Sequence, residues 1–325
     1  MDILKELDGA RKIGISGHVR PDGDCVGSCL AMYGYLRKAM PDCELTLFLE
    51  PPSEVFSFLK YYDRIDNSFV GINDFDAYIA LDAGDSERLG KAEPFFKRAK
   101  KTLCIDHHVS NPGYGDISLI EPDSSSTCEM LYRLFEKKYV DDDIATALYT
   151  GIVHDTGVFQ YSNTRKATFD VVGDLVEYDF DCSKIIDDTF YKKSYVQNQI
   201  LGRVLTESIL FMDGRCIAGC VTRKMMNFYE ARATDLEGIV NQLRVTEGVE
   251  VAIFMHELRS QEYKVSMRSN GKVDVSLIAL YFGGGGHVRA AGCMMNGSYY
   301  DVINNLSLHI EKQLEEFEKN PVIKR

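Results

Sequence analysis

Residues 12–24 read KIGISGHVRPDGD, a short apolar strand followed by a loop rich in polar side chains. A helical pattern of about four turns follows this loop. Four further apolar segments of strand length come later, at residues 45–49, 77–81, 102–105 and 117–120. Strands that alternate with helices are typical of a mostly parallel sheet with helices on both faces. We therefore predict an α/β fold in which the loops after the strands carry the chemistry.

The pattern changes twice in the remainder of the chain. Residues 124–190 are mainly helical in pattern, and the serines at 124–126 predict the start of a helix. Beyond this region we expect a smaller α+β domain with two hairpins and three helices. The hairpins are expected at residues 208–221 and 249–268, and the helices at residues 234–244, 275–282 and 300–319. We therefore predict domains at residues 1–190 and 195–325, joined by a polar linker within residues 187–198.

Length and composition are those of an ordinary globular protein. The 325 residues are 45% hydrophobic and 26% charged, and a chain of this length predicts two domains. No apolar run approaches the roughly 18 residues of a membrane span, and the first residues lack a signal-peptide core. The nine cysteines are an odd number without metal-finger spacing, which indicates a reducing compartment. We therefore expect a cytoplasmic protein without a membrane partner, and the sequence leaves monomer and homodimer open.

The net charge of −12 belongs to one part of the chain. Residues 195–325 hold as many basic as acidic side chains, so the whole surplus of acid lies in residues 1–194. An acidic chain does not bind long duplex nucleic acid through a basic stripe. If the N-terminal part acts on phosphates, bound metal ions must supply the positive charge. Surface acids that only favour solubility explain the charge equally well.

Four segments of the first half place Asp and His side chains where an α/β sheet presents them. They are residues 18–24, Asp82-Ala-Gly-Asp85, Asp106-His107-His108 and His154-Asp155. Each one alone has an ordinary interpretation as a turn or a helix cap. Together they bring several carboxylates and at least two imidazoles to one edge of a sheet, where like charges need cations. Such ligands, without thiolates, suit Mn²⁺ or Mg²⁺, and two ions are a common device for phosphoryl transfer.

The second half carries a glycine-rich segment, GGGGHVRAAG, at residues 283–292. Its bare backbone N–H groups predict a loop that binds an anion at the N-terminus of a following helix. A run of glycines can instead be a flexible linker. Upstream, Arg268 ends a predicted strand and is a candidate to clamp a phosphate with its planar guanidinium, unless it is an ordinary surface arginine. We therefore predict a phosphate-binding surface in this domain.

In combination these motifs resemble the DHH phosphoesterase superfamily. The resemblance rests on the loop of residues 18–24, the Asp82 loop, Asp106-His107-His108 and the His154-Asp155-Thr156 segment. GGGGHVRAAG resembles the DHHA1 domain that accompanies the DHH domain in this superfamily. The length and the two domains are similar to the nano-RNase (oligoribonuclease) and pAp-phosphatase group. The resemblance implies a DHH domain, then a DHHA1 domain, with an active site in the cleft between them.

The resemblance also implies roles for individual residues. Two divalent ions would share Asp82, with Mn²⁺ expected and Mg²⁺ or Co²⁺ as alternatives. The other ligands would be His18 and Asp22 for one ion, and Asp24, His107 and Asp155 for the other. Asp106 would orient a histidine, and His108 would face the phosphate as a donor or a catalytic acid. The substrate would be bound in the second domain by Arg268, Ser269, Gly285, Gly286 and His287.

The expected function is metal-dependent hydrolysis of phosphoester bonds in very short oligoribonucleotides, linear dinucleotides or pAp. Water activated by two metal ions would attack phosphorus in line. One alternative is an inorganic polyphosphatase or pyrophosphatase, although such a substrate has no sugar or base for the second domain to bind. Another alternative is a non-catalytic nucleotide sensor, which would not need Asp82 as a bridge. The sequence does not rank the nucleotide substrates.

Overall fold

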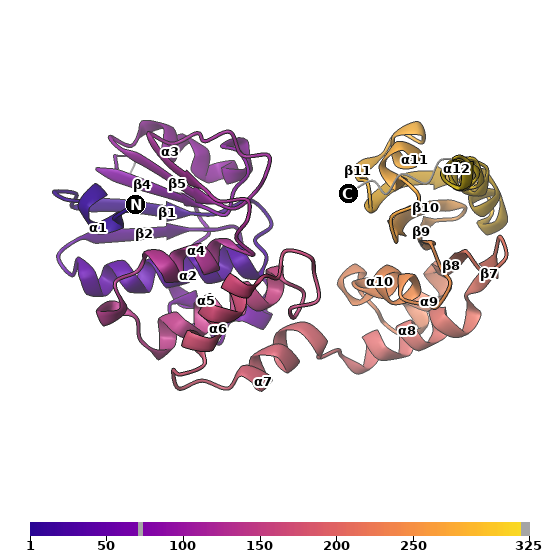
Figure 1. Cartoon of the computed structure of the whole chain (residues 1–325). Helices are drawn as coiled ribbons and strands as arrows, with labels where there is room; N and C mark the ends of the chain where they lie inside the picture. Colours follow the sequence, from indigo (N-terminus) through magenta and orange to yellow (C-terminus); the bar gives the residue numbers. More distant parts are fainter. Residues whose placement is uncertain (71–73, 320–325) are drawn as a thin grey trace. The chain divides into compact units, whose positions relative to one another are not determined.

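The structure is a computed structural model that describes residues 1–70 and 74–319. The chain divides into two compact units, Met1–Lys192 and Lys193–Arg325. Figure 1 labels the helices and strands of both units. Each unit is built around its own six-stranded sheet and has its own hydrophobic core.

The N-terminal sheet has six parallel strands in the order β3-β2-β1-β4-β5-β6. The strands are β1 (Lys12–Ser16), β2 (Glu44–Phe48), β3 (Ile65–Asp66), β4 (Ala77–Leu81), β5 (Thr102–Asp106) and β6 (Ile117–Ile120). The central strands β1, β4 and β5 are mainly apolar and almost wholly buried, as expected for a parallel sheet covered on both faces. Because β2 and β4 lie on opposite sides of β1, the strand order reverses between β1 and β4.

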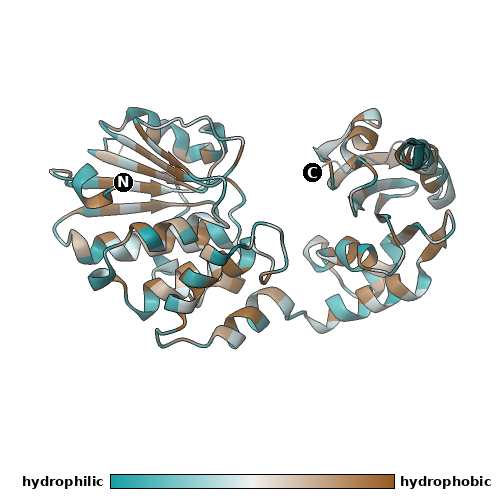
Figure 2. Ribbon diagram, in the orientation of Figure 1, coloured by the Kyte–Doolittle hydropathy of each residue, from teal (hydrophilic) through white to brown (hydrophobic). Residues whose placement is uncertain are grey.

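Helices cover both faces of this sheet, with α2, α4, α5 and α6 on one face and α3 on the other (Figure 1). The helices are α1 (Ile3–Glu6), α2 (Gly23–Ala39), α3 (Glu93–Arg98), α4 (Thr127–Leu134), α5 (Asp142–Asp155), α6 (Lys166–Leu175), α7 (Cys182–Ile186) and a π-helix (Asp187–Tyr191). Short 3₁₀ turns occur at Glu54–Phe56, Tyr62–Arg64, Glu87–Ala92 and Lys137–Tyr139. The α3 side is packed with aromatic rings, while the α2 and α5 side is mainly aliphatic. Figure 2 shows hydrophobic residues concentrated on these strands and on the helix faces toward them.

The predicted α/β architecture is confirmed for this unit. All five predicted strands are present, with β2 shifted by one residue and β5 one residue longer. The structure adds β3, whose two residues are too few to show a strand pattern. Ser126 caps α4 by accepting a hydrogen bond from the backbone N–H of Glu129 at 3.0 Å, as the serine run predicts. The segment expected as a linker is largely helical, because it holds the π-helix and the start of α8.

The C-terminal sheet has the strand order β11-β12-β10-β9-β8-β7. Its strands are β7 (Ile209–Phe211), β8 (Cys216–Val221), β9 (Val251–Arg259), β10 (Glu262–Ser269), β11 (Gly285–His287) and β12 (Ala290–Asn296). β8 and β9 are parallel, and the other neighbours are antiparallel. Both predicted hairpins are confirmed, as β7–β8 and β9–β10.

Helices lie on both faces of the C-terminal sheet. They are α8 (Tyr195–Glu207), α9 (Arg223–Phe228), α10 (Ile239–Arg244), α11 (Val275–Tyr281), α12 (Tyr299–Lys319) and a 3₁₀ turn at Ala233–Leu236. The helix predicted over residues 234–244 is divided at Gly238, whose φ of +82° lies in the left-handed region. α8 and α10 pack on one face, and α11 and α12 on the other. None of the helices in the described part of the chain has the length and apolar character of a bilayer span.

The glycine-rich segment does not begin a helix, so that prediction is wrong. α11 ends at Tyr281, a turn follows, and Gly285–His287 pairs with β12 as an edge strand. The small residues expected to form a helix after the glycines belong to β12 instead, because backbone pairing with β10 and β11 holds them extended. At Gly286 φ is +145°, and a Cβ there would lie 2.5 Å from the carbonyl oxygen of Ala290. The glycine therefore permits a close approach of β11 to β12.

Candidate metal centre

The carboxyl ends of three neighbouring strands, β1, β4 and β5, form one edge of the N-terminal sheet. His18 follows β1, Asp82 follows β4, and His107 and His108 follow β5. Since the strand order reverses between β1 and β4, this edge is where an open α/β sheet binds ligands. The structure therefore brings together the predicted residues of these three loops.

The N-terminus of α2 supplies two carboxylates. Asp22 caps the helix by accepting from the backbone N–H groups of Asp24 and Cys25, both at 3.2 Å. The carboxylate of Asp24 is buried and accepts from the backbone N–H groups of Thr127 at 2.7 Å and Cys128 at 3.0 Å, at the start of α4. Both carboxylates are thus placed at helix N-termini, where backbone N–H groups favour negative charge.

A glycine on α5 leaves the space that Asp24 occupies. A Cβ on Gly151 would lie 2.8 Å from the Oδ1 atom of Asp24 and 2.2 Å from the Sγ atom of Cys128. Any larger residue at position 151 would therefore displace this carboxylate or the start of α4. The helix packing and the placement of the carboxylate depend on the same glycine.

The first donor group consists of His18, Asp22 and Asp82. The Nε2 atom of His18 lies 3.5 Å from Oδ2 of Asp22 and 3.5 Å from Oδ2 of Asp82. The Nδ1 atom of His18 lies 2.9 Å from the carbonyl oxygen of Val19. With a proton on Nδ1, this contact leaves Nε2 to act as a ligand toward the carboxylates.

The second donor group consists of Asp24, Asp82, His107 and Asp155. The Nε2 atom of His107 lies 3.3 Å from Oδ2 of Asp155, 3.6 Å from Oδ1 of Asp82 and 4.0 Å from Oδ2 of Asp24. Asp155 is the last residue of α5. The Nδ1 atom of His107 lies 3.3 Å from the carbonyl oxygen of Ser124, so this histidine is oriented in the same way as His18.

Asp82 belongs to both donor groups. One of its carboxylate oxygens faces His18 and the other faces His107. The residue is 2% exposed, and its φ of +53° lies in the left-handed region, which Asp enters more readily than most residues. The hydroxyl of Thr127 donates to Oδ1 of Asp82 at 3.2 Å. Asp82 therefore occupies the position from which one carboxylate can serve two ions.

Four carboxylates in a largely buried site repel one another. Burial, reinforced by Asp24, raises the pKa of Asp82 well above its usual range, and burial also raises the pKa of Asp24. Burial, followed by Asp24 and Asp22, raises the pKa of Asp155 to about 8. Burial lowers the pKa of His18, but hydrogen bonds with Asp22 and Asp82 outweigh it and raise the pKa to about 12. The metal-free site therefore holds protons where cations would neutralise it.

The donor set fits two divalent ions such as Mn²⁺ or Mg²⁺. Groups of three donors, with atoms within 4.8 Å of one another, occur around both His18 and His107. Cys25 lies within that distance of His18 and Asp82, but burial raises the pKa of its thiol well above the usual value, so the thiol stays protonated. Carboxylates and imidazoles without a thiolate suit octahedral ions better than a structural zinc.

His108 is oriented by a chain of two hydrogen bonds. Its Nδ1 atom lies 2.7 Å from Oδ1 of Asp106, which is completely buried. The side-chain amide of Asn111 donates to the other oxygen of Asp106 at 2.7 Å. These bonds outweigh burial and lower the pKa of Asp106, so it stays ionised beside the histidine. The histidine that Asp106 orients is therefore His108.

Three supporting residues were not predicted from the sequence. They are Asn111, which holds Asp106, Thr127, which holds Asp82, and Asn163, which lies beside Asp155. The side-chain amide of Asn163 donates to the backbone oxygen of Asp155 at 3.1 Å and lies 3.5 Å from its Oδ2 atom. The available signal was their position in the loop after β5, at the start of α4 and in the loop after α5, but tertiary packing decides which carboxylate each one contacts.

His154 lies next to Asp155 but has structural contacts. Its Nε2 atom lies 2.8 Å from the hydroxyl oxygen of Thr189, in the π-helix. Its ring packs against Phe56 and Phe190, with centroid distances of 5.0 and 5.8 Å. His154 therefore joins α5 to the last helical turn of the N-terminal unit, in keeping with the absence of a predicted role.

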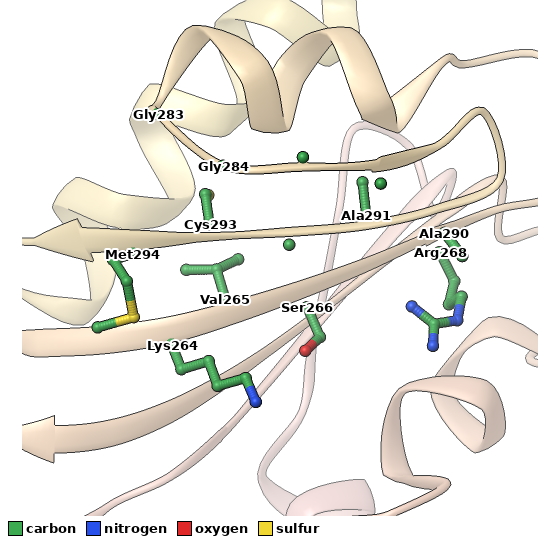
Figure 3. A pocket seen from close by; sticks show the side chains of 13 residues that line it. Lys264, Val265, Ser266, Arg268, Gly283, Gly284, Ala290, Ala291, Cys293 and Met294 are labelled. Carbon is green, nitrogen blue, oxygen red and sulfur yellow. The ribbon is translucent and has the colours of Figure 1, made fainter. Parts of the chain in front are cut away.

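Three of the predicted substrate-binding residues line one cavity of the C-terminal unit. Arg268, Gly285 and Gly286 line a cavity of about 530 Å³ beside β10 and β12. Figure 3 shows this cavity with Arg268 labelled. The Nε atom of Arg268 donates to the side-chain oxygen of Asn241 at 3.1 Å. This bond to a neutral group holds the guanidinium without neutralising its charge.

The two other predicted substrate-binding residues lie outside this lining. Ser269 is 2% exposed, and its hydroxyl donates to Oε1 of Glu250 at 3.2 Å. A serine that follows Arg268 on a strand points to the opposite face of the sheet, which is why it faces the interior. His287 is an exposed residue of β11 and does not line the cavity.

Comparisons with known proteins match both parts of the chain. Residues 12–152 match the model of the DHH family, N-terminal domain, and residues 218–317 match the DHHA1 domain. The bifunctional oligoribonuclease and PAP phosphatase NrnA of Thermus thermophilus is 29% identical over 300 residues, which cover 91% of this chain and 87% of the relative. The protein of the same name from Bacillus subtilis is 27% identical over 281 residues, with 85% and 86% covered.

Among solved structures, the chain is similar to an exopolyphosphatase-related protein from Bacteroides fragilis. The TM-score is 0.84 at 24% sequence identity, and the match covers 99% of this chain and 96% of the other. A likeness at this level of identity shows that the two proteins share a fold.

Proposed function

Because the chain belongs to the DHH–DHHA1 phosphoesterase superfamily, we propose that it hydrolyses phosphoester bonds in very short oligoribonucleotides, linear dinucleotides or pAp with two divalent metal ions. The family recognised from the sequence motifs is confirmed for both domains. The observation that carries the proposal is the position of Asp82, whose two oxygens face two separate histidines. The names of the two curated relatives support the choice of substrates.

The proposed metal ligands are the predicted ones, with Mn²⁺ as the proposed ion. They are His18, Asp22 and Asp82 for one ion, and Asp24, Asp82, His107 and Asp155 for the other. When bound, two such ions lower the pKa of a coordinated water and neutralise charge on phosphate oxygens. The backbone N–H groups that hold Asp22 and Asp24 keep these carboxylates in place before substrate arrives.

His108 is the proposed proton donor of the site. Its Nδ1 atom is fixed by Asp106, so its Nε2 atom is left to donate to a phosphate oxygen or to the leaving oxygen. The side chain is 36% exposed, in contrast to the buried His18, which suits a group that must reach substrate. Asp106 acts through His108 and is a positioning residue.

The C-terminal unit is proposed to hold the part of the nucleotide that does not react. Arg268 offers a guanidinium to a phosphate, and Gly285 and Gly286 leave the backbone open on the other side of the same cavity. Ser269 is left out of this proposal because its hydroxyl is bound to Glu250. His287 stays a prediction as a substrate-binding residue.

A comparison of rates on several substrates tests the proposed function. Purified protein is assayed with pAp, a dinucleotide, a longer oligoribonucleotide and inorganic pyrophosphate, in Mn²⁺, Mg²⁺ or Co²⁺ and with a chelator. We expect hydrolysis of pAp or the dinucleotide in Mn²⁺, little with the longer oligomer, and none with the chelator. Preferred hydrolysis of pyrophosphate would overturn the proposal in favour of a pyrophosphatase. An Asp82→Asn variant, purified in parallel, reports any contaminating nuclease.

We also propose that the protein works in a reducing cytoplasm. All nine cysteines are free thiols in the structure, and five of them are completely buried. Free thiols are the normal state of cysteines in that compartment. Fractionation of the source cells, with detection of the protein in each fraction, tests the location.

A further inference from the structure

The N-terminal unit ends in the π-helix Asp187–Tyr191, which follows α7 directly. π-Helices are rare, occur mostly as single turns and are frequently found at functional sites. This one contains no buried residue, and residues 191–195, which lead into α8 of the C-terminal unit, are all exposed. The start of the connection between the units therefore depends on the few contacts that hold the π-helix.

Two features beside the π-helix do not hold it in place. A cavity of about 290 Å³ lies along α7, and its lining includes Phe58, Phe180, Ile185 and Asp188. The cavity therefore reaches the first turn of the π-helix and leaves this side loosely packed. The carboxylate of Asp188 also pairs with Lys192 at 3.0 Å, but an exposed pair within one segment contributes little and ties the segment to nothing else.

A hydrogen bond from His154 does attach the π-helix to the rest of the unit. The hydroxyl of Thr189 donates its hydrogen to the carbonyl oxygen of Ile185 at 2.8 Å. The same hydroxyl oxygen lies 2.8 Å from Nε2 of His154, so it accepts from an N–H group at Nε2. The ring of Phe190 packs beside the imidazole, with a centroid distance of 5.8 Å. We call the hydrogen bond between His154 and Thr189 the latch.

The imidazole of the latch also packs against an element that carries proposed metal ligands. A Cβ on Gly23 would lie 2.3 Å from Cγ of His154, so the ring occupies the space that this glycine leaves at the start of α2. Gly23 stands between Asp22 and Asp24, and Asp155 follows His154 at the end of α5. Three proposed ligands are thus chain neighbours of the histidine or of the glycine it contacts.

We propose that the latch couples the metal centre to the start of the connection between the units, an inference whose effect on catalysis rests on the proposed function. Bound cations fix the ends of α2 and α5 around His154 and, through Thr189, the π-helix. A fixed π-helix gives the C-terminal unit a defined starting point, and a misplacement of about 1 Å can cost roughly 100-fold in rate. His154 is then a positioning residue that acts through Thr189. Because such coupling is reciprocal, loss of the latch should be felt at the π-helix when metal binds.

Hydrogen–deuterium exchange of the full-length protein tests the latch without relying on hydrolysis. Backbone exchange in residues 188–192 is measured by mass spectrometry, in a chelator and in saturating Mn²⁺, for the wild type and for Thr189→Val. Valine keeps the shape of threonine and removes only the hydroxyl, at a position that is not a proposed ligand. Thr206→Val is the matched control, because its hydroxyl also donates to the carbonyl oxygen four residues earlier but lies on the exposed surface of α8.

Exchange in the π-helix should depend on both the metal and the latch. We expect Mn²⁺ to slow exchange of residues 188–192 in the wild type and in Thr206→Val, and much less in Thr189→Val. With Mn²⁺ bound, exchange in Thr189→Val should be about 2–10-fold faster than in the wild type, as for the loss of a hydrogen bond between neutral groups. Thr189→Ser, which keeps the hydroxyl, should exchange like the wild type. Equal exchange in the wild type and Thr189→Val, or no response of the wild type to Mn²⁺, would overturn the proposal.

Rates on two substrates test the effect on catalysis. Thr189→Val should lower kcat/KM for a dinucleotide several-fold and leave the content of bound Mn²⁺ unchanged. It should also leave kcat/KM for a small activated phosphodiester unchanged, because that substrate offers the C-terminal unit little to bind. An equal loss on both substrates, or none on either, would overturn the positioning role. If the wild-type protein hydrolysed neither substrate, the proposed function would fail, while the Mn²⁺-dependent exchange would still support the coupling.

Discussion

The two units of the molecule use charge in opposite ways. The N-terminal part carries the whole acid surplus of the chain and buries carboxylates at the edge of its sheet. Residues 195–325 hold equal numbers of acids and bases, and β10 presents Lys264 and Arg268, which have no acidic partner among the described residues. A metal centre needs fixed anions that water cannot screen, whereas a nucleotide must reach its binding groups from solution. The contrast supports the proposal that this acidic chain acts on a polyanionic substrate.

The units also differ in how firmly their functional groups are held. In the metal centre, Asp24 is held by backbone N–H groups of α4, and His18 and His107 each face a backbone carbonyl. On β10, Arg268 has one side-chain partner, Asn241, and Lys264 has none among the described residues. Rigid placement favours a chemical step, because reacting groups must be positioned before the transition state. Side chains that bind the rest of a substrate can adjust to it.

Loss of Asp82 should have the largest effect, because it removes the residue that both donor groups share. We expect Asp82→Asn to abolish hydrolysis in saturating Mn²⁺, beyond the roughly 10–100-fold loss typical of residues that only support a ligand. Asparagine keeps the shape of the side chain and tolerates the left-handed backbone at this position. Steady-state assays with a dinucleotide and with pAp measure the effect.

The same variant should leave the fold intact and stabilise the metal-free protein. Burial and Asp24 raise the pKa of Asp82, so its ionisation in the folded state is unfavourable, and a neutral amide avoids that cost. Thermal unfolding in a chelator near pH 8 should therefore give a higher Tm for Asp82→Asn than for the wild type. Activity near that of the wild type would refute Asp82 as the bridge between two ions.

Arg268→Ala should weaken substrate binding by the C-terminal unit and leave the metal centre unchanged. The loss of a hydrogen bond to a charged group costs about 1.5–3 kcal/mol, so kcat/KM for a dinucleotide should fall by about 10–150-fold. The content of bound Mn²⁺ should not change, because no proposed ligand is touched. A small activated phosphodiester offers this unit little to bind, and its kcat/KM should fall far less. An equal loss on both substrates would mean that Arg268 does not hold the substrate.

Asp106→Asn should show whether Asp106 orients His108 or helps to hold the metal ions in the N-terminal unit. One oxygen of the buried carboxylate faces His108 and the other accepts a hydrogen bond from Asn111. In an asparagine one of these two atoms is an NH₂ group, which cannot accept, so one of the two contacts is lost. We expect kcat to fall by about 10–100-fold with little change in KM or in metal content. Measured loss of bound metal instead would place Asp106 among the groups that hold the ions.

Sequence reasoning identified the five longer strands of the N-terminal sheet and the polar loops that follow them, because both depend on local signals. Apolar strands followed by His18, Asp82 and His107 are read directly from the chain, and parallel strands present their carboxyl ends at one edge. The supporting contacts of Asn111 and Thr127 depend on the packing of the β5 loop and α4 against Asp106 and Asp82, which no local pattern encodes.

The glycine-rich segment shows the opposite case, where a local signal led to the wrong structure. Four glycines before small residues favour a loop and a helix, but pairing of Gly285–His287 with β12 makes a hairpin. Long-range backbone pairing outweighs the weak preferences of glycine and alanine. The expectation that Ser269 binds substrate came from the family resemblance, whereas the alternation of side chains along β10 turns Ser269 to the interior, where it contacts Glu250.

The smallest expected effect is on how the stability of the metal-free protein depends on pH, through Asp155 of the metal centre. Burial, followed by Asp24 and Asp22, raises the pKa of Asp155 to about 8, so the folded state holds this proton more tightly than the unfolded chain does. Its contribution to stability is complete below the usual carboxyl range and is lost as the pH rises toward 8. The Tm of the metal-free wild type should therefore fall by a few degrees between pH 5 and pH 8, and Asp155→Asn should reduce that fall. Glu177→Gln, which removes an exposed acid of the same unit, should not. An identical pH dependence in Asp155→Asn and the wild type would show that the acidic site does not strain the N-terminal unit in the absence of metal.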